Sequence, residues 1–188
     1  MTPRTSSRRP GARALVVAGA LAATLGLGAC SAVEDPSAAA LVDGEVAVTQ
    51  ADVATVVDEL PTEITGGEPV PASQVLTFLA ISEAVSDLAV ETETGVIGEA
   101  GAQEFLASVD EEAGRRPGTY SEATLRLIST NLMLGQIQED PANGELVQAT
   151  IDDVRGRLEV NPRYGEVSED EQQLISPLQH PWLAVPEA

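Results

Sequence analysis

The chain has 188 residues, of which 30 are acidic and ten are basic, and its formal net charge is −20. So negative a chain repels nucleic acid and anionic lipid headgroups, which disfavours both as surface partners. A single cysteine excludes an internal disulfide, and a single histidine disfavours zinc sites and catalytic triads that depend on this residue type.

The first 29 residues have the three parts of an export signal. A basic stretch with arginines at positions 4, 8, 9 and 13 precedes an apolar run from Ala14 to Leu27 that only Thr24 interrupts. This run is shorter than the roughly 20 apolar residues that a membrane-spanning helix needs. Its basic flank and small-residue end instead predict a cleavable signal peptide over residues 1–29.

The signal ends at Leu27-Gly28-Ala29-Cys30, and this tetrapeptide resembles the lipobox of bacterial lipoproteins. In that family the cysteine thiol takes a diacylglyceryl group, and the chain is then cut before the cysteine. The resemblance implies a mature protein that starts at an acylated Cys30. Fatty acids such as palmitate would then anchor it to the extracytoplasmic face of the cell membrane. The alternative is an ordinary secretory signal with an incidental cysteine.

Loss of the signal would leave an even more acidic protein. Six arginines and no lysine then stand against all 30 acidic residues, which gives a formal charge of −24. The use of arginine alone, with much Ala, Gly, Val and Glu, is typical of a high-GC genome such as that of an actinobacterium. Residues 30–39, small and polar with Pro36, are expected to form a tether between the lipid and a single domain.

The domain is predicted to begin with a β-hairpin and a capped helix. Two short strands over residues 40–48 flank Asp43-Gly44, a dipeptide that suits a type I′ turn. Thr49 is followed three residues later by Asp52, which predicts a capping box at the start of the first helix.

Four further helices are predicted from apolar residues at helical spacing. The second helix, from Pro71 to about Glu91, is apolar on more than one face. It is therefore expected to lie at the centre of the core or to offer a surface to a partner. Thr119 and Glu122 predict a second capping box. The expected helices are 50–60, 71–91, 99–109, one from this second cap to about 138, and 145–157, followed by a strand at 158–160.

These elements resemble the N-terminal chaperone domain of SurA and PrsA proteins. Those domains open with a strand carrying Val-Asn-Gly or Val-Asp-Gly and continue with Ile-Thr-x-x-Asp/Glu-Val into the first helix. Val42-Asp43-Gly44 and the segment Val-Thr-Gln-Ala-Asp-Val at 48–53 hold those positions here. The segment Val-Asn-Pro-Arg-Tyr-Gly at 160–165 is similar to the ending of actinobacterial SurA-N-like lipoproteins.

The resemblance implies a mainly α fold. A helical bundle over residues 40–165 would be closed by a small β element that joins its N- and C-terminal parts, and residues 166–188 would form an acidic, proline-rich tail. In many members a parvulin prolyl-isomerase domain follows the helical region, but too few residues remain here for one. The resemblance therefore implies a binding module without isomerase chemistry, and not an enzyme.

Residue types that carry chemistry are sparse. His180 is the only histidine and is expected to pack in the tail or at the surface. The acidic clusters at 110–112, 152–153 and 169–171 lack the spacing of a calcium loop and are expected to be solvated, so no metal or cofactor is predicted. The segment 161–165, Asn-Pro-Arg-Tyr-Gly, is interpreted as a structural turn whose arginine pairs with an acidic neighbour, rather than as a recognition loop.

The expected function is reversible binding of unfolded or exported polypeptides by a lipid-anchored, chaperone-like protein. An apolar cleft would take up client side chains, and the candidates to line it are Phe78, Leu79, Phe105, Leu132 and Met133. The same residues are equally candidates for the core. The main alternative is a structural or interaction lipoprotein that docks one specific envelope partner. A small-molecule-binding lipoprotein fits less well, because the chain is small and aromatic residues are few.

Overall fold

The β-hairpin at the start of the domain forms around a turn that few residue types accept. A computed structural model describes residues 35–170 and 173–177. Strands β1 (Ala38–Val42) and β2 (Glu45–Thr49) pair antiparallel. Asp43 and Gly44 between them have φ values of 55° and 78°, and a type I′ turn requires positive φ at both positions. The predicted hairpin is confirmed, although β1 begins two residues before the expected domain boundary at residue 40.

Helix α1 (Gln50–Glu59) begins at the predicted capping box. The Thr49 hydroxyl accepts a hydrogen bond from the Asp52 amide at 3.1 Å, and the Asp52 carboxylate accepts one from the Thr49 amide at 3.0 Å. Two of the amides that a helix start leaves without a partner are thereby satisfied.

The second predicted capping box is wrong. Helix α5 (Glu122–Gln138) begins after Ser121, whose hydroxyl accepts a hydrogen bond from the Thr124 amide at 3.3 Å. The cap lies here rather than at Thr119 because the Glu59 carboxylate of α1 accepts hydrogen bonds from the Ser121 amide at 2.9 Å and the Ser121 hydroxyl at 2.8 Å. A contact between distant parts of the chain thus selects the helix start.

The helix predicted over residues 71–91 is in fact two helices. α2 (Ala72–Ala80) and α3 (Ser82–Glu91) meet at Ile81 and differ in direction by 45°. The Ser82 hydroxyl donates a hydrogen bond to the Leu79 carbonyl at 2.8 Å, and such local bonds favour a bend. Within the described ranges no single helix is long and apolar enough to cross a membrane, and only this bent pair meets the criterion together.

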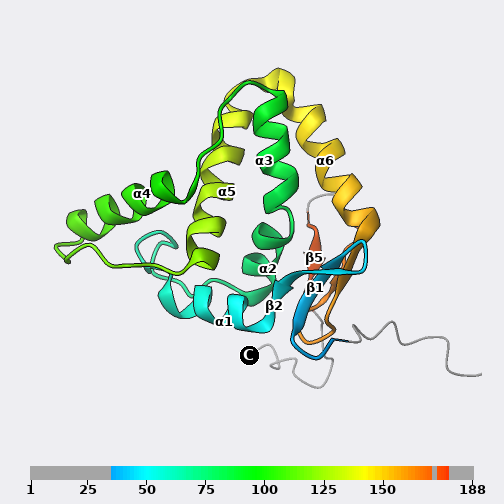
Figure 1. Cartoon of the computed structure of the whole chain (residues 1–188), viewed down its shortest axis with the longest axis horizontal. Helices are drawn as coiled ribbons and strands as arrows, with labels where there is room; N and C mark the ends of the chain where they lie inside the picture. The colour runs from blue at the N-terminus through cyan, green and yellow to red at the C-terminus, as the bar shows by residue number, and fades with distance from the viewer. Residues whose placement is uncertain (1–34, 171–172, 178–188) are drawn as a thin grey trace, which may run out of the picture. The chain divides into compact units, whose positions relative to one another are not determined.

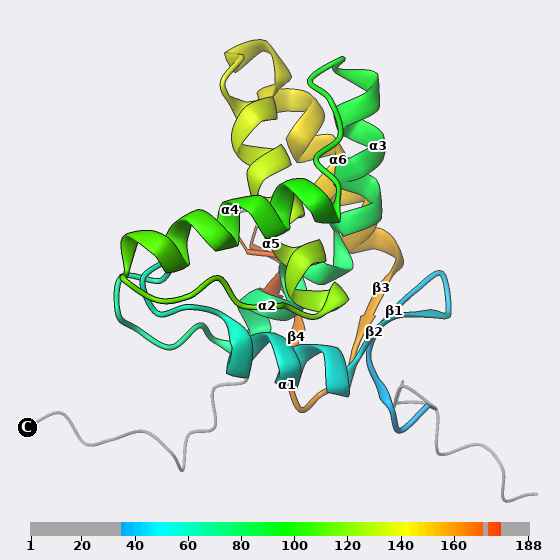
Figure 2. The same ribbon diagram turned by 60° about the vertical axis from the view of Figure 1, so that its left-hand side comes forward.

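Helix α5 lies at the centre of the helical part. It packs against α1, α2, α3 and α4 (Glu99–Glu112), and nine of its 17 residues are buried. A 3-10 turn, η1 (Pro141–Asn143), leads from α5 into α6 (Gly144–Arg157), which packs against α3 (Figure 1). Figure 2 shows α4 crossing α5.

The core is almost entirely aliphatic, as the scarcity of aromatic residues predicts. Its largest fully buried side chains include Leu76, Leu79, Leu106 and Ile137. They come from α2, α4 and α5, so the core forms where these helices meet.

Strand β3 (Leu158–Val160) returns the chain to the hairpin. It pairs antiparallel with β1, with Ala40 opposite Val160, and the sheet order is β2-β1-β3. The fold is therefore mainly helical with a small β element that joins its N- and C-terminal parts, as predicted.

The segment predicted as a tail from residue 166 is folded where the structure describes it. β4 (Glu166–Val167) and β5 (Ile175–Ser176) pair antiparallel, and Leu174 and Ile175 are buried in the core. Although the segment is acidic overall, its two apolar residues Leu174 and Ile175 belong to the core of the fold. Cys30, His180 and the first half of the expected tether, residues 30–34, lie outside the described residues.

Candidate functional site

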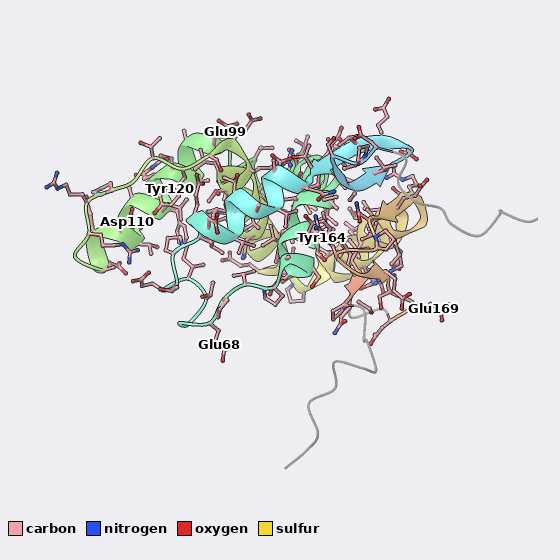
Figure 3. The ribbon with its side chains drawn as sticks, turned by 90° about the horizontal axis from the view of Figure 1, so that it is seen from below. Glu68, Glu99, Asp110, Tyr120, Tyr164 and Glu169 are labelled. Atoms are coloured by element: carbon pink, nitrogen blue, oxygen red, sulfur yellow. The ribbon has the colours of Figure 1, made fainter. Side chains whose placement is uncertain are left out.

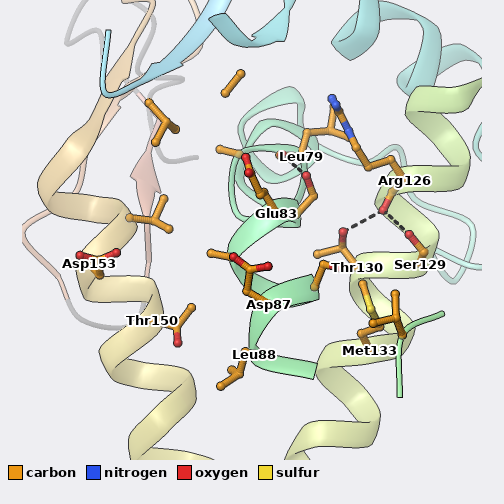
Figure 4. A pocket seen from close by; sticks show the side chains of 18 of the residues that line it. Leu79, Glu83, Asp87, Leu88, Arg126, Ser129, Thr130, Met133, Thr150 and Asp153 are labelled. Carbon is orange, nitrogen blue, oxygen red and sulfur yellow. Dashed lines mark hydrogen bonds between the residues drawn. The ribbon is translucent and has the colours of Figure 1, made fainter. Parts of the chain in front are cut away.

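A broad groove of about 1080 Å³ lies beside α3. Side chains from α3, α5, α6 and the β-hairpin line it. In Figure 4, α3 runs between α5 and α6, and the hairpin lies at one end. The groove exists because α5 and α6 both pack against α3 and leave one of its faces uncovered.

Helix α3 places three carboxylates in this groove. Glu83, Asp87 and Glu91 are exposed and follow one another at four-residue spacing, so they lie along one face of the helix. Figure 4 shows Glu83 and Asp87 in the groove. Like charges at this spacing disfavour a helix, so the row does not serve the stability of α3. The surrounding elements add five more carboxylates, those of Asp43, Glu45, Glu99, Glu122 and Asp153.

One of the two arginines in the groove is fully engaged in ion pairs. Arg157 of α6 donates hydrogen bonds to Asp43 at 2.7 Å and to Asp153 at 2.5 Å. These bonds, the one to Asp43 first, raise the pKa of the Arg157 guanidinium above its ordinary value. The pair with Asp43 connects the hairpin turn to the end of α6 and so fixes one end of the groove.

The other arginine, Arg126, lies on α5. Its Nε atom is buried and has no hydrogen-bond partner among the described residues. The Ser129 and Thr130 hydroxyls both donate to its backbone carbonyl, at 2.9 and 2.8 Å (Figure 4). These bonds satisfy the two buried hydroxyls within the helix, so the guanidinium is the polar group that α5 contributes to the groove together with Glu122.

Apolar side chains also reach the surface of the groove. Val46, Val96 and Leu146 are 44%, 53% and 41% exposed, and all three line it. Five large hydrophobic side chains of the described residues are 40% or more exposed, and three of these five line the groove. A concentration of exposed apolar side chains around a groove is typical of a binding surface.

The structure brings together only two of the five residues predicted to line a cleft. Leu79 and Met133 line the groove, but both are almost fully buried, so they form its base and belong equally to the core. Phe78, Phe105 and Leu132 do not line it and pack half-buried against the core.

The exposed lining residues Val46, Val96 and Leu146 are not among the five residues that the sequence predicted to line a cleft. Val46 and Val96 are smaller than the phenylalanines, yet they are the ones left exposed. The acidic row of α3 was visible as a four-residue spacing of carboxylates inside an apolar helix.

A second polar cluster surrounds Asp110 at the end of α4. Its carboxylate is 4% exposed and accepts hydrogen bonds from the Gly118 amide at 2.8 Å, the Tyr120 hydroxyl at 2.9 Å and Arg115 at 2.9 Å (Figure 3). The prediction that the cluster at 110–112 is solvated is therefore wrong for Asp110, because the loop after α4 folds back onto this residue. Glu111 and Glu112 are exposed.

This cluster holds the α4–α5 loop in place. The Gly118 amide first, then Tyr120 and Arg115, lower the pKa of Asp110 below its ordinary value, against the opposing effect of burial. Burial first, and then the hydrogen bond to Asp110, raise the pKa of Tyr120 to about 12. Arg115 also pairs with Glu63 at 2.5 Å, which connects this loop to the one before α2. The cluster lies outside the groove, and its partners give it a structural role.

Residues 161–165 form the predicted turn, but with a different arginine partner. Arg163 donates a hydrogen bond to the Gln50 side-chain oxygen at 2.8 Å rather than to a carboxylate. Gln50 is the first residue of α1, so the turn is attached to the helix that follows the hairpin.

Within the described part of the chain, no group of three or more His, Cys, Asp or Glu side chains is placed to hold a metal ion. Comparison with known proteins identifies no relative, because no family model, curated protein or solved structure matches the chain.

Proposed function

We propose that the protein is an extracytoplasmic, lipid-anchored, chaperone-like protein that binds unfolded or exported polypeptides without isomerase chemistry. The observation that carries the proposal is the groove beside α3, where exposed apolar side chains surround a space of about 1080 Å³. Unfolded chains expose apolar side chains to water, and a groove of this size can cover several of them at once.

The order of elements supports the same proposal. The chain proceeds from a hairpin with Val42-Asp43-Gly44 through a capped first helix and a helical middle to a strand that returns to the hairpin. This is the order that the resemblance to SurA and PrsA N-terminal domains implies. We therefore propose membership of that group, with the groove as the client site.

Attachment to the membrane is proposed to occur through an acylated Cys30. A chain that carries Cys30→Ser would lose its lipid, and radiolabelled palmitate would label the original chain but not the variant. The proposed anchor is wrong if the variant stays with the membrane fraction to the same extent as the original chain.

The client-binding proposal is tested by aggregation of unrelated unfolded proteins, followed by light scattering. The full chain, purified in mild detergent, is expected to slow aggregation of several such clients. The variant V46S/V96S, which removes two exposed groove valines, is expected to need about tenfold more protein for the same effect, because each valine contributes a partly buried apolar contact.

The matched control removes two exposed valines that do not line the groove. Val57 and Val90 are 40% and 64% exposed, and V57S/V90S is expected to leave the activity unchanged. Equal loss in both variants would show that the groove is not the site. If the original chain slows aggregation of no client, the proposal is wrong, and a lipoprotein that docks one specific envelope partner is favoured instead.

A further inference from the structure

The charges that line the groove are far from balanced. Eight carboxylates and two guanidinium groups leave it a formal charge of −6. Arg157 already pairs with Asp43 and Asp153. The other six carboxylates are exposed and form no ion pair with any described residue; they are Glu45, Glu83, Asp87, Glu91, Glu99 and Glu122.

Two of the elements that line the groove contribute both a carboxylate and an exposed apolar side chain. On β2, Glu45 precedes the exposed Val46, and the loop before α4 presents Val96 three residues before Glu99. The acidic row of α3 lies between α5 and α6 (Figure 4), and the exposed Leu146 of α6 also lines the groove. A ligand that contacts the apolar side chains therefore enters a groove that also carries several carboxylates.

We infer that the groove selects cationic polypeptide segments, in which lysine or arginine alternates with apolar residues. This inference rests on the proposed function and specifies its client class. Apolar side chains of the client would cover the exposed valines and Leu146, while its cations would face the six unpaired carboxylates. Charge complementarity of this kind favours one class of partner and repels the opposite class.

An acidic client would be excluded by the same charges. The whole chain is strongly negative, and an acidic client would bring a further negative charge close to several groove carboxylates. Only the guanidinium of Arg126, which forms no ion pair with a described residue, could offset it. Selectivity should therefore depend on ionic strength, because the groove carboxylates are exposed and salt screens exposed charges.

The probes are three short fluorescent peptides that share one apolar pattern and carry lysine, serine or glutamate at the alternating positions. Binding to the full chain in mild detergent is measured by fluorescence anisotropy. At low salt the lysine peptide is expected to bind about tenfold more tightly than the serine peptide, and the glutamate peptide more weakly than both. At high salt the difference is expected to shrink.

The decisive variant neutralises the acidic row of α3. Glu83→Gln, Asp87→Asn and Glu91→Gln together are expected to weaken binding of the lysine peptide about tenfold and to leave the serine peptide unaffected. All three residues are exposed, so the substitutions preserve the packing of α3.

The matched control removes the same number of charges from an exposed part of α4 outside the groove, with Glu104→Gln, Glu111→Gln and Glu112→Gln. It is expected to leave the affinity for the lysine peptide within about twofold of the original, because only a distant, screened charge changes. Equal losses in the two triple variants would show that the charge of the whole chain, and not the groove, attracts the peptide.

The outcomes distinguish this inference from the proposed function. If the lysine, serine and glutamate peptides bind equally well and aggregation is still slowed, the client class is wrong while the chaperone-like function stands. If no peptide binds and no client is protected, the proposed function itself fails.

Discussion

The side-chain amide of Asn161 donates a hydrogen bond to the backbone carbonyl of Ala38, at 3.0 Å and across 123 positions of the chain. The Asn161 backbone amide donates to the neighbouring Ala39 carbonyl at 2.9 Å, and the side-chain oxygen accepts from the Arg163 amide at 3.1 Å. One residue therefore joins the first strand of the domain to the turn that follows β3.

Asn161→Ala is expected to lower the free energy of unfolding by about 1–3 kcal/mol, because it leaves the Ala38 carbonyl without its partner in a part-buried position. Denaturant unfolding of the full chain, followed by circular dichroism, measures the change. The control Asn131→Ala alters an exposed residue of α5 and is expected to cause no loss of stability. Equal stability of the Asn161 variant and the original chain would contradict this role.

Gly165 occupies a position that no other residue fits. Its φ is 137°, and a Cβ built there would lie 2.3 Å from the Ser176 carbonyl oxygen. Gly165→Ala is therefore expected to cost about 1–3 kcal/mol of unfolding free energy by separating β4 from β5. Gly135→Ala in α5 is expected instead to raise the unfolding free energy by about 0.5–1 kcal/mol. That glycine is helical, and a Cβ built there would meet nothing within 4 Å. Denaturant unfolding measures both changes. The comparison is wrong if the two variants change the unfolding free energy in the same direction.

Local signals in the sequence were sufficient for most of the fold. The Asp43-Gly44 turn and the Thr49–Asp52 capping box each depend on residues close together in the chain, so they could be predicted without knowledge of the fold. The helix start at Ser121 could not be predicted in this way. Thr119 also fits the capping-box pattern, and the distant carboxylate of Glu59 decides between the two positions.

The candidate site was harder to predict than the fold. Two of the predicted cleft residues, Leu79 and Met133, lie at the base of the groove, because large apolar residues are usually buried where helices meet. Phe78 and Phe105, also predicted to line a cleft, do not line the groove. Which apolar residues stay exposed depends on how helices far apart in sequence pack. No local sequence pattern predicts this packing.

Asp110 makes the stability of the fold depend on pH in the acid range. Its pKa is lowered in the folded protein, so its contribution to stability is complete above the ordinary aspartate pKa and is lost as the pH falls through the folded-state value. Asp110→Asn is expected to lower the melting temperature by several degrees at neutral pH, with a difference that shrinks as the solution is acidified. Thermal unfolding over a pH series measures this difference.

The control for this prediction is Glu111→Gln, the neighbouring exposed carboxylate. It removes the same charge without disturbing the bonds to Gly118 and Tyr120, so its melting temperature is expected to follow that of the original chain at every pH. A constant difference between Asp110→Asn and the original chain across the series would show that the Asp110 charge does not titrate with folding.

Tyr120 makes the corresponding contribution in the alkaline range. Burial and its hydrogen bond to Asp110 raise its pKa to about 12, whereas an unfolded tyrosine ionises at about 10. Its contribution to stability is therefore complete below about pH 10 and is lost as the pH rises toward about 12. Residue 120 of the Tyr120→Phe variant cannot ionise, so the unfolding free energy of the variant is expected to fall less steeply than that of the original chain over this interval.

The phenolate absorbance of the original chain minus that of the variant isolates Tyr120 from Tyr164, the other tyrosine. A difference curve centred near pH 10 would mean that the Asp110–Tyr120 bond does not hold the proton in solution.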